Sequence, residues 1–228
     1  YRAQTLVPYV SVVPNLVGVP MSNAELESFF DTHIMVLNIK NNLAFQTNQI
    51  IKRIFDIVCT VCGGILISPL LLAVFVWVKL DSPGPAIYKQ RRVGKDGKEF
   101  DCYKFRSMVV DSKERLEKLL ATDPKAKEEW ERDFKLKNDP RITKSGAFLR
   151  KTSLDELPQL LNVLKGEMSL VGPRPIVQKE VPRYEQYIKE YYMVLPGITG
   201  LWQVSGRSDT TYPERVAMDM WYVHNWSV

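Results

Sequence analysis

Residues 149–175 read LRKTSLDELPQLLNVLKGEMSLVGPRP, and the clearest helical pattern of the chain lies within them. The leucines at positions 157, 160, 161 and 164 follow the i, i+3, i+4, i+7 spacing of a helix with one buried face. Lys165 followed by Gly166 is typical of a last helical turn and the residue that ends it. The stretch therefore predicts a short helix with a buried leucine face that ends near Lys165.

Two alternatives exist for the start of this helix. Ser153, with Glu156 three residues later, fits a capping box. That arrangement would place Leu154 inside the helix, where its carbonyl would clash with the ring of Pro158. We therefore favour a start at Asp155 or Glu156, with Pro158 in the first turn, where its missing N–H costs nothing.

Asp155 and Glu156 are adjacent carboxylates at this expected helix start. A helix N-terminus offers free N–H groups and partial positive charge, which attract phosphate and keep a neighbouring carboxylate ionised. An ionised Asp155 could act as a nucleophile toward phosphorus, and Glu156 could hold a hard cation. The alternative is that both are ordinary charges of a first helical turn, where acidic residues are common.

The composition narrows the class of protein. The chain has 228 residues, 45% of them hydrophobic, and a net charge of +5, which suits anionic partners such as phosphates or lipid headgroups. Because no nucleic-acid motif is present, a nucleic-acid partner is not expected. Cys59 and Cys62 form a CxxC inside an apolar run without a second pair, which argues against a zinc or redox site. The only histidines, His33 and His224, lie outside any ligand cluster, so a histidine-based mechanism is not expected.

An apolar run of 22 residues without a charge extends over 57–78. About 20 apolar residues cross a bilayer as a helix, but Ser68 and Pro69 in the middle of the run predict a kink or break. Basic residues flank both ends of the run, so the positive-inside rule gives no direction across the membrane. A re-entrant helix with both ends on the cytoplasmic side satisfies both observations. The alternative is a buried core helix of a soluble protein.

The remaining elements are predicted to be short. Residues 1–46 have the pattern of an α/β fragment, with a strand over 10–14, a helix over 23–30 and a strand over 34–39. This fragment has no glycine-rich phosphate fingerprint, so no nucleotide site is expected there. The expected elements after the apolar run are a β-hairpin over 86–108 with its turn at 94–97, two charged helices over 109–137 broken near Pro124, a helix over 177–193, a shaped loop over 195–207 and a helix over 212–226.

Residues 149–175 resemble the signature of the bacterial sugar transferases, the monotopic polyprenyl-phosphate phosphoglycosyl transferases. Three further segments also resemble this family: DSPGPAIYKQRRVGKDGKEFDCYKFRSM at 81–108, NDPRIT at 138–143 and LPGITGLWQVSGR at 195–207. Together the segments extend over roughly residues 50–228. Several long motifs in the same order are far more specific than one short motif. The chain is most similar to the larger members of the family, which start the assembly of bacterial polysaccharides.

The resemblance implies an α+β fold. A re-entrant membrane helix over 47–80, broken at Ser68 and Pro69, would precede a small mixed α/β catalytic domain over 81–228 with amphipathic interfacial helices. Residues 1–46 would be the tail of a preceding Rossmann-like domain. The protein would lie at the bacterial inner membrane, with its catalytic domain facing the cytoplasm.

The resemblance also implies a reaction. A sugar-1-phosphate, of galactose or a related hexose, would pass from a UDP-sugar to undecaprenyl phosphate with release of UMP. Asp155 would form the covalent intermediate, and Glu156 would hold Mg²⁺. Four arginines are the candidates for binding phosphate, namely Arg150 at the family's basic position and the further residues Arg106, Arg141 and Arg174. UDP-sugar, undecaprenyl phosphate and membrane lipids would be the partners, and a homodimer is left open.

Two other functions remain open from the residues alone. A non-catalytic membrane-surface module could bind anionic headgroups through the same basic residues, although it would gain nothing from Asp155 and Glu156. A Mg²⁺-dependent hydrolase could use Glu156 to cleave UDP-sugar without any lipid. Release of UMP and its dependence on the lipid acceptor separate the three functions.

Overall fold

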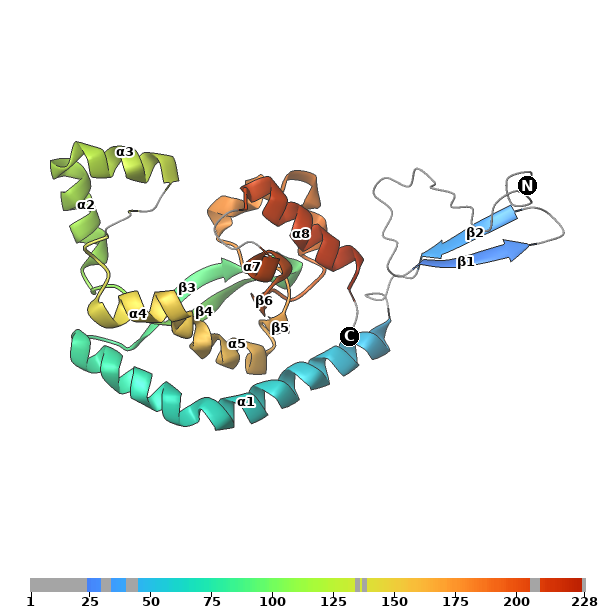
Figure 1. Ribbon diagram of the computed structural model, residues 1–228, viewed down its shortest axis with the longest axis horizontal. Helices are drawn as coiled ribbons and strands as arrows, with labels where there is room; N and C mark the ends of the chain where they lie inside the picture. The colour runs from blue at the N-terminus through green and yellow to red at the C-terminus, as the bar shows by residue number, and fades with distance from the viewer. Residues whose placement is uncertain are drawn as a thin grey trace, which may run out of the picture.

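The computed structural model describes residues 24–29, 34–39, 45–133, 136, 139–205 and 210–226. These residues form helices and three separate two-stranded sheets, which agrees with the predicted α+β class. Figure 1 shows one long helix, α1, running along one side of a domain that the later elements build.

The N-terminal elements are a pair of strands. Strand β1 (Ala24–Phe29) pairs antiparallel with β2 (Ile34–Ile39). The predicted strand over 34–39 is confirmed, and the predicted helix over 23–30 is wrong. Cross-strand pairing with β2 stabilises β1 in a way that the local sequence does not report. The strand expected over 10–14 lies outside the described residues.

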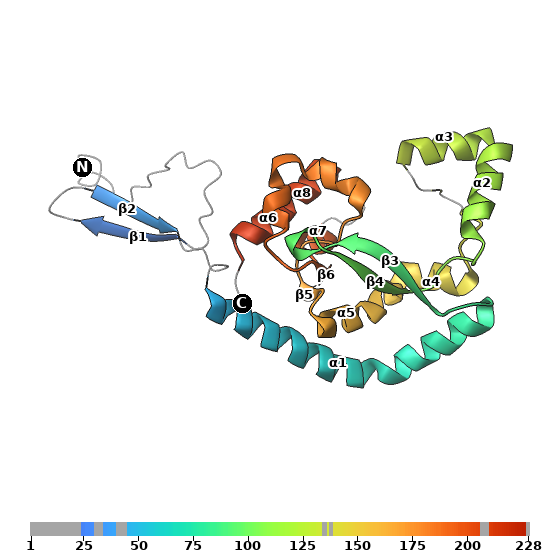
Figure 2. The same ribbon diagram turned by 180° about the vertical axis from the view of Figure 1, so that it is seen from behind.

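Helix α1 (Gln46–Asp81) continues through Pro69 without a break. Pro69 has no N–H to donate to the carbonyl of Ile65, and the Ser68 hydroxyl donates to that same carbonyl at 2.7 Å. The helix is bowed in Figures 1 and 2, but it does not fold back on itself. The predicted break is therefore absent, and the re-entrant hairpin is not confirmed.

Most of the apolar surface of α1 is exposed. The helix is long and apolar enough to cross a membrane: its best 18-residue window has a mean hydropathy of 2.5 and is only 11% buried. Ile65 and Leu66 are 70% and 81% exposed. A core helix of a soluble protein would bury these side chains, so the buried-core alternative does not fit.

Both ends of α1 are attached to the same domain. Near its start, the buried Asp56 accepts hydrogen bonds from the Ser169 hydroxyl at 2.7 Å and from Lys52 at 2.6 Å. At its end, Asp81 accepts from the backbone N–H of Ser145 at 2.9 Å and from its hydroxyl at 2.7 Å. Figures 1 and 2 show α1 on the same side of the domain as α4 and α5.

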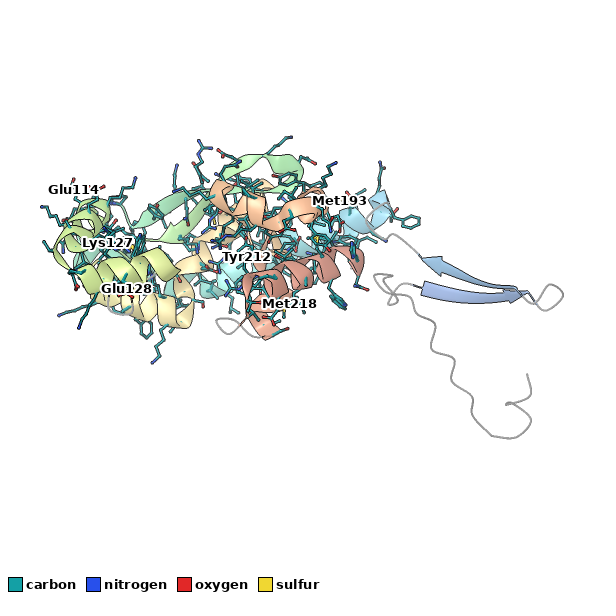
Figure 3. The ribbon with its side chains drawn as sticks, turned by 90° about the horizontal axis from the view of Figure 1, so that it is seen from above. Glu114, Lys127, Glu128, Met193, Tyr212 and Met218 are labelled. Atoms are coloured by element: carbon teal, nitrogen blue, oxygen red, sulfur yellow. The ribbon has the colours of Figure 1, made fainter. Side chains whose placement is uncertain are left out.

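The domain begins with a β-hairpin. Strands β3 (Ile87–Val93) and β4 (Glu99–Phe105) pair antiparallel across the short 3-10 turn η2 (Lys95–Gly97), as predicted. Two charged helices follow, α2 (Ser112–Thr122) and α3 (Pro124–Asp133), and the predicted boundary at Pro124 is confirmed. Glu114, Lys127 and Glu128, which are labelled in Figure 3, are exposed on these helices, as expected of a solvated face.

The centre of the domain comprises helix α4 (Lys144–Thr152), the 3-10 helix η3 (Leu154–Gln159) and helix α5 (Leu160–Lys165). The end of the predicted helix is confirmed, because Gly166 follows Lys165 with φ of 84°. Its buried leucine face is not confirmed: Leu161 is 53% exposed, whereas Val163 is fully buried. Periodicity finds an apolar stripe but does not say what covers it.

The C-terminal part packs a second core. Its helices are η4 (Gln178–Tyr187), α6 (Ile188–Tyr191), α7 (Leu201–Ser205) and α8 (Tyr212–His224). The short strands β5 (Ser169–Val171) and β6 (Gly197–Thr199) pair in parallel.

The helix expected over 177–193 is mostly 3-10 and is interrupted at Glu185, whereas α8 agrees with its prediction. The expected loop over 195–207 instead contains β6 and α7. Tyr184 and Tyr191 are buried in this core, and Trp221 is 55% exposed.

Candidate functional site

A sharp turn between α4 and η3 positions the two carboxylates. Ser153 adopts a left-handed conformation with φ of 60°, which is uncommon for a residue other than glycine, and its side chain makes no cap hydrogen bond. The favoured start at Asp155 or Glu156 is therefore wrong, and the alternative with Ser153 before the helix has the right position but not the side-chain bond of a capping box. A 3-10 helix spans Leu154–Gln159, and the α-helix begins only at Leu160. Pro158 fits this tighter helix because the clash that proline causes with the i−4 carbonyl belongs to the α-helix.

Helix α4 is brought close to the site by a glycine. Thr143 caps α4, its hydroxyl accepting from the Gly146 N–H at 3.0 Å. A Cβ atom at Gly146 would lie 2.1 Å from the carbonyl oxygen of Ser107, so only glycine allows this approach. One turn later, Arg150 donates from Nε to the Ser107 hydroxyl at 2.9 Å. The hydrogen bond to Ser107 thus holds the side chain of Arg150 in place. Arg150 precedes Asp155 by five residues in the chain.

Asp155 is buried, with 9% of its surface exposed. Burial raises the pKa of the Asp155 carboxyl, Glu156 adds to the rise, and the positive charges of Lys104 and Arg150 oppose it. The expectation that a helix N-terminus keeps this carboxylate ionised is therefore too simple, because desolvation outweighs the favourable charges. An acidic group between two cations in a buried setting is typical of a reactive site.

Glu156 points toward the β-hairpin. Its Oε1 lies 2.6 Å from the ammonium of Lys104 on β4, and both side chains are mostly buried. Cys102 and Lys104 are two residues apart on β4, so they share one face of the strand. Lys104 could not be singled out from the sequence, because no local signal separates it from the other basic residues of the hairpin.

Arg106 and Arg141, two of the four predicted arginines, make contacts that shape the domain. Arg106 donates to the carbonyl of Ser82 at 2.6 Å and to its hydroxyl at 2.9 Å, in the link between α1 and β3. Arg141 binds the Asp139 carboxylate through two nitrogens, at 2.8 and 2.6 Å, and stacks on the ring of Trp130 at 5.1 Å. Arg141 is thereby committed to its neighbours, whereas Nε and Nη1 of Arg106 are buried and have no hydrogen-bond partner among the residues that the structure describes.

Arg174 lines the same pocket as Glu156. It follows β5 and stacks over the ring of Trp202 at 5.5 Å. Its position depends on the pairing of β5 with β6, where a Cβ atom at Gly197 would lie 2.1 Å from the backbone nitrogen of Gly172. A pocket opens here, and its polar lining comprises Arg92, Lys104, Glu156, Gln159, Arg174 and Gln203. Arg92, Gln159 and Gln203 are further residues that the sequence analysis did not single out.

The carboxylates present suit a weakly held Mg²⁺. Within the part of the chain that the structure describes, no three His, Cys, Asp or Glu side chains are grouped as a metal cage. Mg²⁺ commonly uses one or two carboxylates together with substrate phosphates and waters, so Glu156 matches its chemistry. Cys59 and Cys62 are both free thiols on α1.

The comparisons with known proteins identify the family of the chain. A family model described as bacterial sugar transferase matches residues 47–228. The chain is 56% identical over 220 residues to the undecaprenyl-phosphate galactose phosphotransferase of Salmonella typhimurium, over 96% of this chain and 46% of that protein. It is 53% identical over 219 residues to the UDP-galactose-lipid carrier transferase of Erwinia amylovora, with the same coverage of 96% and 46%.

A shorter relative is also similar. The exopolysaccharide production protein ExoY of Rhizobium meliloti is 49% identical over 177 residues, which are 78% of this chain and 78% of that protein. The chain thus spans about half the length of the Salmonella and Erwinia relatives and most of the length of the Rhizobium one.

Proposed function

The chain belongs to the bacterial sugar transferase family, as residues 149–175 predicted, and on this premise we propose that it transfers a sugar-1-phosphate from a UDP-sugar to undecaprenyl phosphate and releases UMP. The observation that carries the proposal is the buried Asp155, flanked by Lys104 and Arg150 and adjacent to Glu156. The names of two relatives specify galactose, which supports galactose or a related hexose as the sugar. The product would start the assembly of a surface polysaccharide.

The transfer would take two steps at one phosphorus atom. A carboxylate oxygen of Asp155 attacks the phosphorus that carries the sugar, and the bond from this phosphorus to the bridging oxygen breaks. UMP leaves with that electron pair. A phosphate oxygen of the lipid then attacks the same phosphorus and releases the Asp155 carboxylate, so the second step restores the protein.

The cations beside the carboxylates would stabilise the charge that develops. Arg150 is fixed by Ser107 and lies on the Asp155 side, where it can bind the phosphoryl oxygens. Glu156 would be the ligand of Mg²⁺, which when bound would supply further neutralisation of the diphosphate. Because Lys104 pairs with Glu156, a metal ion at Glu156 would free the ammonium of Lys104 to bind substrate phosphate.

We also propose that α1 enters the membrane and returns on the same side. Its two attachments, at Asp56 and Asp81, contact one domain. In a straight helix at about 1.5 Å per residue these residues would be about 37 Å apart, more than the ~30 Å hydrocarbon core, so a straight crossing would divide the domain between two sides. The bow at Ser68 and Pro69 would mark the deepest point.

The exposed apolar residues next to α1 support the same orientation. Phe148 of α4 and Leu161 and Leu164 of α5 are exposed, on helices that lie along α1. Such residues favour the interface between water and lipid. Because the donor is a water-soluble nucleotide, the domain would face the cytoplasm at the bacterial inner membrane. The homodimer stays a prediction.

The test is UMP release from a panel of UDP-hexoses, with and without undecaprenyl phosphate, using protein in lipid nanodiscs. We expect many turnovers with the lipid, and without it at most one UMP per protein together with a covalent sugar phosphate seen by intact mass. Many turnovers without lipid would identify a hydrolase instead. No release with any donor would leave a membrane-surface module and overturn the proposal.

A further inference from the structure

Helix α4 exposes a face that carries two lysines and a phenylalanine. Lys144, Phe148 and Lys151 follow the i, i+4, i+7 spacing of one helix face, and all three side chains are exposed. The opposite face contains Leu149, which is fully buried in the domain. We call the exposed side, defined by Lys144, Phe148 and Lys151, the outer face of α4.

Phe148 joins the outer face to the helix that is proposed to enter the membrane. The rings of Phe148 and Trp77 have their centroids 5.5 Å apart, and Trp77 belongs to the last part of α1. Both rings are partly exposed, and the nearby Leu80 of α1 is 81% exposed. Aromatic side chains are enriched where the headgroups of a membrane meet water. The outer face therefore continues the apolar surface of α1 at the level expected for lipid headgroups.

The positive charge of the outer face is not balanced locally. Helix α4 contains no acidic residue, and neither Lys144 nor Lys151 forms an ion pair with a described residue. Asp81 offsets part of the charge of Lys144, but this carboxylate accepts hydrogen bonds from the N–H and the hydroxyl of Ser145. Exposed lysines beside a membrane helix attract lipids with a negative headgroup.

We propose that the outer face of α4 binds the headgroups of anionic phospholipids, with the ammonium groups of Lys144 and Lys151 on the lipid phosphates. The rings of Phe148 and Trp77 then lie at the level of the upper acyl chains. A lysine side chain suits this place because its methylene groups cover apolar surface while the ammonium stays among polar groups. The proposal rests on the proposed insertion of α1 and names the class of lipid that the domain meets there.

Such a contact would also set the height of the site above the membrane. Arg150 belongs to α4, and its Nε donates to the Ser107 hydroxyl at 2.9 Å. The turn at Ser153 and the 3-10 helix with Asp155 follow α4 directly. Headgroups on the outer face would therefore hold Asp155 near the membrane surface, where a lipid acceptor presents its phosphate.

Helix α3 supplies a matched control. Lys125 and Lys127 are exposed on this helix, which Figures 1 and 2 show on the side of the domain away from α1. Changing both to glutamine removes as many positive charges as changing Lys144 and Lys151 to glutamine. Only the second pair of changes lies on the outer face of α4.

The experiment measures which lipid lies beside Trp77. The whole chain is placed in nanodiscs of phosphatidylglycerol and phosphatidylcholine in equal amounts, with bromine on the acyl chains of one lipid or the other. Bromine quenches nearby tryptophans, and the same measurement on Trp77→Phe isolates the signal of Trp77. We expect phosphatidylglycerol to be favoured beside Trp77 by at least about fivefold, because one lysine at an anionic surface contributes about that factor.

The variants and salt test the cause of this preference. Lys144→Gln together with Lys151→Gln should lower the preference to less than about twofold, whereas Lys125→Gln together with Lys127→Gln should keep it. Raising the salt concentration from about 0.1 M to about 1 M shortens the Debye length from about 10 Å to about 3 Å and should remove most of the preference. Adding one undecaprenyl phosphate per protein should leave it unchanged, since phosphatidylglycerol is in large excess.

Equal quenching by the two brominated lipids would overturn the proposal and leave the insertion of α1 intact. No quenching of Trp77 by either lipid would overturn both. The proposal is also wrong if the variant of Lys144 and Lys151 keeps the preference, or if the control on α3 loses it equally. Loss of the preference at one undecaprenyl phosphate per protein would assign the outer face to the acceptor instead.

Circular dichroism reports whether each variant is folded, and the salt dependence of the unchanged protein carries the test if the variant of Lys144 and Lys151 is not. The proposed transfer fails separately. If phosphatidylglycerol is favoured in the expected pattern but no UDP-hexose releases UMP, the transfer is excluded and the headgroup surface stands.

Discussion

The ammonium of Lys104 lies 2.6 Å from the carboxylate of Glu156, and this ion pair joins strand β4 to the 3-10 helix that also carries Asp155. Lys104 therefore belongs to the electrostatic surroundings of both carboxylates. Removing its charge should change how Asp155 titrates and how Glu156 meets a metal ion.

The first prediction concerns the nucleophile. Asp155→Asn should lower transfer by about 10³-fold or more, because an amide cannot form the acyl phosphate. The intact mass of this variant should show no sugar phosphate after incubation with UDP-galactose. Asp111→Asn, at an exposed position of the same domain, is the control and should keep full activity. An Asp155→Asn protein that still acquires the added mass would place the nucleophile elsewhere.

The second prediction concerns Glu156 and Mg²⁺. Glu156→Gln should lower activity strongly and shift the Mg²⁺ titration to higher concentration, because a neutral amide is a weaker ligand for a hard cation. Activity as a function of free Mg²⁺ checks this. An unchanged titration midpoint in the variant would show that the metal ion is held by other groups.

The third prediction concerns pH. Lys104 lowers the pKa of Asp155, so Lys104→Gln should raise that pKa further. Less Asp155 is then ionised at a given acidic pH, and the acid limb of kcat/KM should move to higher pH. The measurement is a pH–rate profile of both proteins. An acid limb that stays in place would mean that Asp155 does not control it.

The fourth prediction concerns a buried carboxyl in the C-terminal core. Asp219 accepts a hydrogen bond from the Tyr184 hydroxyl at 2.7 Å, and burial raises the pKa of Asp219 from 3.8 to about 7. Between these two values the folded protein binds more protons than the unfolded chain. The free energy of unfolding should therefore fall as pH rises from about 4 to about 7, by a few kcal/mol.

Asp219→Asn keeps an acceptor for Tyr184 and removes the titration. Thermal unfolding of both proteins at pH 5 and pH 8 checks this. The variant should be the more stable of the two at pH 8. Its free energy of unfolding should lack the pH dependence that Asp219 gives the unchanged protein. Equal loss of stability in both proteins between the two pH values would assign the effect to another group.

The fifth prediction concerns the attachment and topology of α1. Asp56→Ala should lower the free energy of unfolding by about 3 kcal/mol, because it leaves the mostly buried ammonium of Lys52 without its carboxylate partner. Asp111→Ala, which breaks an exposed pair with Arg115, should change it far less, because water screens an exposed ion pair. Equal effects of the two substitutions, measured by denaturant unfolding, would show that the attachment adds no stability.

In a protein without its native cysteines, Asn48→Cys and Lys113→Cys should both be shielded from an impermeant thiol reagent in intact cells, since both ends of α1 would lie inside. Adding Pro69→Leu should straighten the helix and favour exposure of position 48 on the outside. Labelling of Asn48→Cys without the proline change would show that α1 crosses the membrane.

Local chemistry made several elements predictable from the residues alone. Gly166 ends α5 because it adopts a left-handed conformation at little cost, and Pro124 begins α3 because a first turn needs no proline N–H. The hairpin of β3 and β4 followed from strand alternation around a turn. The adjacent Asp155 and Glu156 could be proposed as a site because both lie in one motif.

Long-range contacts decided the rest. Nothing near Lys104 in the chain distinguishes it from other basic residues, and it is selected by the packing of β4 against η3. Arg92 and Gln203 meet in one pocket although 111 positions separate them in the numbering. The pKa of Asp155 is set by desolvation, which depends on what covers the side chain. Hydrophobic periodicity and capping act within a few residues, whereas burial and ion pairing depend on groups that only folding brings together.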